Sequence, residues 1–319
     1  MQRRAFITGL ASVAAWPATG RAQQDNTPVI GVLVLGTPDP GLFLRALREG
    51  LTQLGYVDGQ NIRLVIRSAG GVAKELPNLA DELVRLKPNV LVTFQTPALV
   101  AASKATSEIP IVMGTGDPDG TGRIASFARP GSNITGVVQG NLETAGKIIE
   151  LIRELLPSAR HVAVLANKTD PFTTPFLSRI KVAATVPGFS IAPYMIDPDQ
   201  ELEAIFDRIT RDKPDALIVQ PSVLSQRGVD LALKHRIPTF APTRQLPTMG
   251  GLASYASRVF DVYRGVASYV DKILKGSNAG DLPIAFPAKF ELVINLKTAK
   301  ALGITVTPMM LGRADEVIE

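Results

Sequence analysis

The chain contains no cysteine, only two histidines and a single tryptophan, and these shortages exclude several kinds of chemistry. Without cysteine there can be no disulfide, thiolate metal site, cysteine nucleophile or lipid-modified cysteine. Neither His161 nor His235 has a metal-ligand partner or a nucleophilic serine at a useful spacing. The residues therefore predict no metal, no cofactor and no catalytic centre, so we expect a protein that is not an enzyme.

Long apolar runs are also scarce, and the longest one lies near the N-terminus. It extends over about 13 residues from Phe6 to Ala18, whereas a membrane-spanning helix needs roughly 20. Arg3 and Arg4 precede it, and Gly20 and Ala22 supply the small residues of a cleavage site. We expect residues 1–22 to be a signal peptide and the protein to be soluble in the periplasm, without direct membrane insertion.

The export route stays open between two alternatives. The segment from Arg3 to Ile7 resembles the twin-arginine consensus, but Gln2 and Thr8 differ from it, so the general secretory route also remains open. Removal of residues 1–22 lowers the formal net charge from +5 to +2, because three arginines and no acidic residue are lost. Basic residues form no run of four, and aromatic residues do not interleave with them, which argues against nucleic acid as a partner.

A long internal repeat organises the rest of the chain. Residues 87–93 read Lys-Pro-Asn-Val-Leu-Val-Thr, and residues 213–219 read Lys-Pro-Asp-Ala-Leu-Ile-Val. Each segment is followed, at a similar distance, by a second apolar run that opens with Ile-Pro, at 109–110 and at 237–238. A turn, a buried apolar strand, a helix and another strand make a parallel-sheet unit. The chain therefore predicts two similar α/β lobes that face each other across a cleft.

Helical and strand patterns alternate through both halves of the chain, which is typical of doubly wound parallel sheets with right-handed crossovers. We expect about three segments to cross between the lobes. The predicted division assigns residues 25–141 and 254–280 to the first lobe. It assigns residues 142–253 and 281–319 to the second.

Several ordered motifs give the chain a family resemblance. They are residues 30–33 (Ile-Gly-Val-Leu), 50–56 (Gly-Leu-Thr-Gln-Leu-Gly-Tyr) with 59–61, 129–136 (Arg-Pro-Gly-Ser-Asn-Ile-Thr-Gly) and 290–299. Together they resemble the substrate-binding proteins of ABC importers of the tryptophan-binding-protein type, over essentially the whole mature chain. This resemblance implies a type I periplasmic-binding fold. The chain differs from the family pattern at Arg244-Gln245, where an acidic residue and Phe are frequent, and at Ala256, where Gly is usual.

Candidate binding residues follow the predicted strands, because ligands of parallel sheets bind beyond the carboxyl ends of the strands. Thr96, Pro97 and Ala98 open a helix whose amides suit a carboxylate, although Thr96 could also simply cap the helix. Asp117 offers a carboxylate to a ligand ammonium, or else stabilises a turn. The remaining candidates are polar side chains after other strands and one aromatic: Thr37, Asp39, Asn167, Gln220, Ser222, Thr243 beside Arg244, and Tyr255.

These observations favour a solute-binding protein over an enzyme. We expect two lobes that close on a small polar solute. The family resemblance implies delivery of this solute to an ABC permease and its ATPase, and makes aromatic or branched-chain amino acids the first candidates. The protein would act as a monomer. A receptor that presents its ligand to a membrane sensor is one alternative, and an exported α/β enzyme is another.

Overall fold

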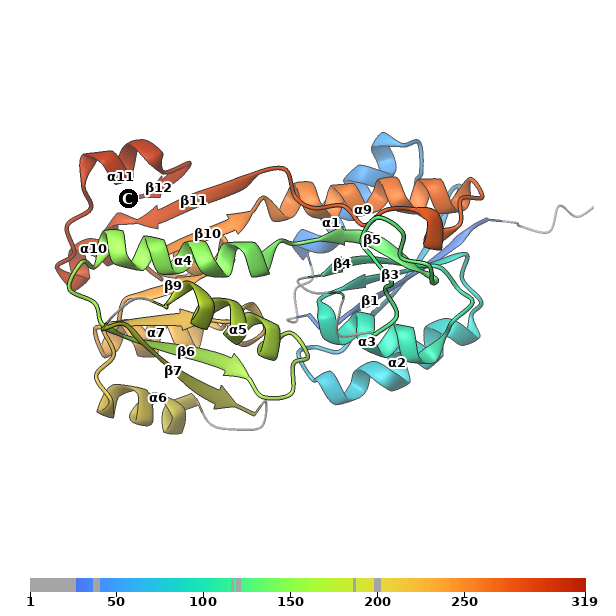
Figure 1. Cartoon of the computed structure of the whole chain (residues 1–319). Helices are drawn as coiled ribbons and strands as arrows, with labels where there is room; N and C mark the ends of the chain where they lie inside the picture. Colours follow the sequence, from blue (N-terminus) through green and yellow to red (C-terminus); the bar gives the residue numbers. More distant parts are fainter. Residues whose placement is uncertain (1–26, 37–40, 116–117, 119–121, 186–187, 198–201) are drawn as a thin grey trace, which may run out of the picture.

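The computed structural model describes residues 27–36, 41–115, 118, 122–185, 188–197 and 202–319. These residues form two α/β lobes that lie side by side (Figure 1). The expected signal peptide lies outside the described residues. Among the described helices, none is long and apolar enough to cross a membrane.

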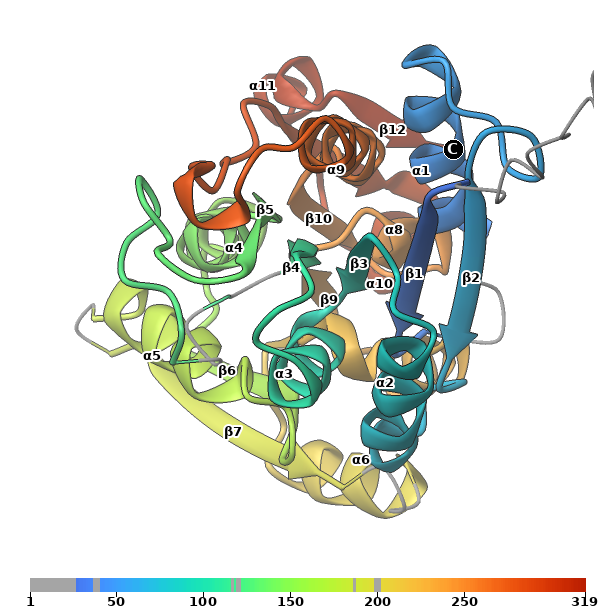
Figure 2. The same cartoon turned by 90° about the vertical axis from the view of Figure 1, so that its right-hand side faces the viewer.

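A five-stranded parallel sheet forms the first lobe, in the order β2-β1-β3-β4-β5. Helices α1 and α9 cover one face of this sheet and α2 and α3 the other (Figure 2). The elements are β1 (Val29–Val34), α1 (Gly41–Gln53), β2 (Arg63–Ser68), α2 (Leu76–Arg85), β3 (Val90–Phe94), α3 (Thr96–Ala105), β4 (Ile111–Thr115), β5 (Ile134–Val138) and α9 (Val259–Leu274).

A seven-stranded sheet forms the second lobe, in the order β12-β11-β10-β9-β8-β6-β7. All neighbouring strands are parallel except β10 and β11. The strands are β6 (His161–Asn167), β7 (Ser190–Ile196), β8 (Ala216–Val219), β9 (Thr239–Ala241), β10 (Ala253–Ser257), β11 (Phe290–Asn295) and β12 (Glu316–Ile318). The helices are α4 (Asn141–Leu155), α5 (Thr173–Ala183), α6 (Leu202–Arg211), α7 (Gln226–Lys234), α8 (Gln245–Thr248), α10 (Leu296–Leu302) and α11 (Pro308–Arg313). The predicted fold class is confirmed.

The sequence repeat has a structural cause in each lobe. Lys87 and Lys213 end α2 and α6 in the left-handed conformation, with φ of 48° and 49°. Two residues later, the Asn89 side chain accepts a hydrogen bond from the first amide of β1, that of Val29, at 2.8 Å. Asp215 does the same for the first amide of β6, at 2.8 Å. The repeated motif thus fixes the helix end and the start of the neighbouring strand in both lobes.

Within the described residues, three segments connect the lobes: β5 to α4, β10 to α9, and the chain from η4 (Ala279–Asp281) to β11 (Figure 1). The expected return to the first lobe at residue 254 falls within β10, which pairs with the second sheet. Ala285 still bridges to Val137 of β5, beyond the expected exit at residue 281. The strand pairing therefore places both crossings a few residues later than the predicted boundaries, since a strand pattern does not say which sheet the strand joins.

Candidate functional site

A cavity of about 880 Å³ lies between the two lobes. Loops at the carboxyl ends of strands from both sheets supply part of its walls, as the rule for parallel sheets predicts. Gln95 and Gln139 follow β3 and β5, and Pro221 and Thr243 follow β8 and β9. The other lining residues are Leu42, Phe43, Pro242, Arg244, Gln245, Thr248, Arg258, Phe260, Tyr263, Ala288, Lys289, Phe290, Glu291, Asp315 and Glu316.

The wall that belongs to the first lobe is aromatic. Phe43 of α1 stacks on Phe94 of β3, with ring centroids 5.2 Å apart and planes inclined by 14°. Tyr263 of α9 meets both rings edge-on, at 4.6 Å from Phe43 and 4.8 Å from Phe94. Phe43 and Tyr263 line the cavity, and the fully buried Phe94 holds both rings in place, so the wall is preorganised for a flat apolar group.

Tyr263 also carries a polar group to this wall. Its side chain is buried, and burial raises the pKa of its hydroxyl far above the usual value. The Gln139 amide donates a hydrogen bond to that hydroxyl at 2.8 Å. The phenol is therefore neutral at physiological pH and stays available as a donor.

Gln95 connects β3 to α3 in a conformation that is unusual for a residue other than glycine, with φ of 71°. Its side-chain oxygen accepts a hydrogen bond from the backbone amide of Gly36, two residues beyond the end of β1, at 3.1 Å. Such backbone strain is frequent at ligand sites. Gln95 is also the residue that precedes α3, so the prediction that Thr96 caps this helix is wrong.

Thr96 is instead the first residue of α3, and Pro97 is its second. The Thr96 and Thr115 hydroxyl oxygens are 2.8 Å apart, so this side chain connects α3 to the end of β4. Ala98 is fully buried in the core beneath α3. The cavity lining includes none of the three predicted residues Thr96, Pro97 and Ala98.

Two of the predicted polar residues of the second lobe, Asn167 and Gln220, belong to a buried hydrogen-bond network. The side-chain oxygen of Gln220 accepts hydrogen bonds from the backbone amide of Asn167 at 2.8 Å and from the Thr173 hydroxyl at 3.1 Å. Its amide nitrogen donates to Asp170 at 3.1 Å, and burial raises the pKa of that carboxyl. Asn167 and Gln220 thereby hold the loops after β6 and β8 together, and Ser222 lies in the latter loop. The neighbouring Pro221 lines the cavity, whereas Asn167, Gln220 and Ser222 do not.

The other predicted site residues divide between the cavity and elsewhere. Thr243 lines the cavity, beside Arg244. Tyr255 stacks on Phe290 with centroids 5.8 Å apart and lines a smaller cavity of about 270 Å³, which we call the outer cavity. Thr37, Asp39 and Asp117 lie outside the described residues, so a ligand role for them stays a prediction.

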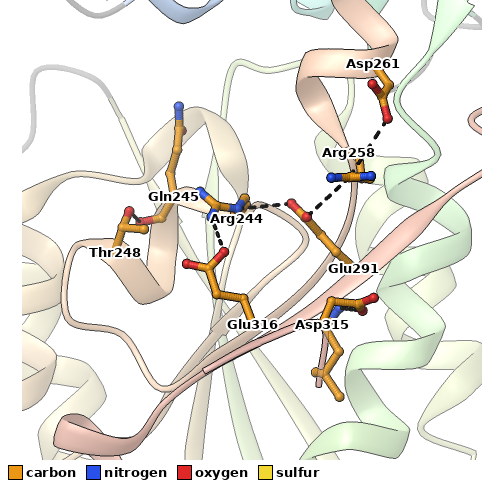
Figure 3. Close-up of polar contacts among 9 residues, drawn as sticks. Arg244, Gln245, Thr248, Arg258, Asp261, Glu291, Asp315 and Glu316 are labelled. Atoms are coloured by element: carbon orange, nitrogen blue, oxygen red, sulfur yellow. Dashed lines mark hydrogen bonds and ion pairs between the residues drawn. The ribbon is translucent and has the colours of Figure 1, made fainter. Parts of the chain in front are cut away.

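A cluster of alternating charges occupies the second-lobe side of the cavity and the crossing segments (Figure 3). Arg244 pairs with Glu316 of β12 and with Glu291 of β11, the latter at 3.3 Å. Arg258, which lies between β10 and α9, pairs with Glu291 at 3.8 Å and with Asp261 of α9 at 3.9 Å. Burial raises the pKa of the Glu291 carboxyl despite its two arginine neighbours.

Sequence reasoning missed the aromatic residues, the two glutamines and Glu291. Phe43 and Tyr263 have the spacing of buried helix residues, and Glu291 lies in an ordinary strand pattern. Of these residues, only Gln95 and Gln139 had a signal in the sequence. Each directly follows a predicted strand, which is where ligand-binding residues are expected. In the described part of the chain, no group of His, Asp or Glu could hold a metal ion.

Comparison with known proteins agrees with this geometry. The family of ABC transporter substrate binding proteins matches residues 38–318. The chain belongs to this family. This substrate-binding protein is similar to a tyrosine-binding protein of Clostridioides difficile, with 25% identity over 82% of this chain and 75% of the relative.

Two solved structures are similar to this substrate-binding protein over almost their whole length. One is an ABC domain from Streptococcus pneumoniae in complex with L-Trp, with a TM-score of 0.85, 26% identity, and coverage of 92% of this chain and 100% of that one. The other is a conserved domain protein from Vibrio cholerae, with a TM-score of 0.85, 25% identity, and coverage of 91% and 99%. The predicted family and its type I periplasmic-binding fold are confirmed.

Proposed function

We propose that this substrate-binding protein is the solute-binding component of an ABC importer and that its solute is an aromatic amino acid. The observation that carries the proposal is the aromatic wall of Phe43 and Tyr263, which the buried Phe94 ring supports, in a cavity large enough for such a ligand. Relatives of similar length that bind tyrosine and L-Trp support it.

In this mechanism the ligand is bound and released without any covalent step. The solute enters between the lobes, and closure about the three crossing segments buries it against both walls. Burial of the ring removes apolar surface from water, which favours the closed state. The ABC permease would then favour the open state, so that the solute is released at the transporter. We expect a monomer to suffice, because one chain supplies both walls.

Calorimetry with tryptophan, tyrosine, phenylalanine, leucine and valine tests the proposal. The only tryptophan is Trp16, so protein that begins at Gln23 contains five tyrosines and no indole. Bound tryptophan would therefore be the sole indole emitter, and its emission should shift to the blue and saturate. Neither heat nor an emission change at millimolar concentrations of all five would refute the amino-acid assignment.

Export to the periplasm is a separate prediction. We expect the mature protein to begin at Gln23, because Gly20 and Ala22 precede that position and the apolar run is short. The intact mass of the protein in a periplasmic extract checks this. An uncleaved mass in washed membranes would contradict both the cleavage and the soluble location.

A further inference from the structure

The two walls of the cavity differ in charge. The described lining residues of the first lobe are uncharged: Leu42, Phe43, Gln95, Gln139, Phe260 and Tyr263. All charged lining residues among those described come from the second lobe or the crossing segments: Arg244, Arg258, Lys289, Glu291, Asp315 and Glu316. Three are cationic and three are anionic, so this side of the cavity carries both signs without a net excess. A zwitterion complements such a wall better than an anion or a cation does.

Glu291 is the carboxylate of this cluster that has most to gain from a ligand. Its side chain is only 12% exposed, and its contacts to Arg244 and Arg258 are 3.3 and 3.8 Å. Charge-assisted hydrogen bonds between such groups are shorter, at about 2.7–2.9 Å. A carboxylate that is desolvated but held by long contacts is incompletely compensated. An ammonium group in the cavity would supply the donors that Glu291 needs.

Arg244 lies beside Glu291 and has guanidinium N–H donors available for a ligand carboxylate. Its contacts to Glu291 and Glu316 use Nε and Nη2, whereas a guanidinium has five N–H donors in a planar fork. Figure 3 shows the guanidinium between the two carboxylates, in the loop after β9. A planar carboxylate is the ligand group that such a fork binds best.

We propose that Arg244 binds the carboxylate and Glu291 the ammonium of an α-amino acid whose aromatic side chain lies on Phe43 and Tyr263. This inference rests on the proposed function and adds the orientation of the ligand. It places the charged head group on the second lobe. The sequence had instead suggested the first lobe, with the amides near Thr96 and the carboxylate of Asp117.

The experiment combines altered ligands with altered protein. The ligands are L-tryptophan, tryptophanamide, which lacks the carboxylate, and indole-3-propionic acid, which lacks the ammonium. The corresponding phenylalanine or tyrosine series is used if wild type prefers that amino acid. The variants are Arg244→Gln and Glu291→Gln, and calorimetry gives the dissociation constant of each pair.

Wild type should bind the amide and the des-amino acid at least tenfold more weakly than the amino acid. Arg244→Gln should bind the amino acid at least tenfold more weakly than wild type, with little further loss for the amide. Glu291→Gln should also bind the amino acid at least tenfold more weakly than wild type, with little further loss for the des-amino acid. This cross pattern assigns each ligand group to its residue, because a merely structural effect would weaken all three ligands alike.

Arg227→Gln and Glu203→Gln are matched controls, since these residues form an exposed ion pair between α7 and α6, away from the cavity. Both should bind all three ligands as wild type does. If Glu291→Gln does not fold, Glu291→Asp keeps the charge but withdraws it, and should lose affinity for the amino acid far more than for the des-amino acid.

Two failures can be told apart. If wild type binds none of the amino acids, the proposed function is wrong and the inference falls with it. If wild type binds the amino acid, but both variants keep the full tenfold preferences for the carboxylate and the ammonium, the function stands and the orientation is overturned.

Discussion

Replacement of Phe43 by alanine should weaken the binding of the preferred aromatic amino acid about 30-fold. The Phe43 ring lines the cavity and lies 4.6 Å from Tyr263 and 5.2 Å from Phe94. Its removal takes away a preorganised contact surface at the centre of the aromatic wall. Loss of such an aromatic contact typically costs about 2 kcal/mol of binding free energy. Calorimetry at equal protein concentration measures the effect.

Phe286→Ala is the matched control for this variant. The Phe286 ring is 48% exposed and meets Phe127 edge-on at 5.1 Å, and it does not line the cavity. Its replacement should leave the dissociation constant unchanged. Equal affinities for both variants and wild type would exclude the aromatic wall as the ligand contact.

The largest effect on stability is expected for Gly136→Ala. Gly136 lies in β5 with φ of +135°, a region that only glycine occupies readily. A Cβ at this position would lie 2.3 Å from the backbone oxygen of Met113 on the neighbouring strand β4. Neither backbone can move without breaking the pairing of these strands. We expect the variant to lose about 3 kcal/mol or more of unfolding free energy, or not to fold.

Gly146→Ala provides the control in the same half of the chain. Gly146 lies within α4, and an added Cβ would find its nearest neighbour, the Ala183 Cβ, at an ordinary 3.7 Å. This variant should gain about 0.5–1 kcal/mol, because alanine favours the helix. Urea denaturation compares the two. A stable Gly136→Ala protein would contradict the backbone geometry of β5.

The fold could be predicted because its signals are local or repeated. The motif at residues 87–93 recurs at 213–219, and the structure shows the same helix end and the same contact to the first amide of the neighbouring strand in both lobes. The crossings were placed less well, since β10 has an ordinary strand pattern and only its hydrogen bonds show which sheet it joins.

The site was predicted less completely, because a cavity between lobes depends on contacts that are distant in the sequence. The rule that ligands bind after strands pointed to the loop that contains Thr243 and Arg244, and both residues line the cavity. It could not separate Gln220, which holds two loops together, from Gln139, which faces the cavity. Phe43 and Glu291 lie 248 positions apart in the sequence, and only the folded chain brings them to one cavity.

A crystal structure of the mature protein with the aromatic amino acid that it binds best tests the central claim most directly. The account predicts that the ligand lies between the lobes, with its ring within about 4 Å of Phe43 and Tyr263. A ligand bound instead in the outer cavity, beside Tyr255 and Leu292, would contradict it.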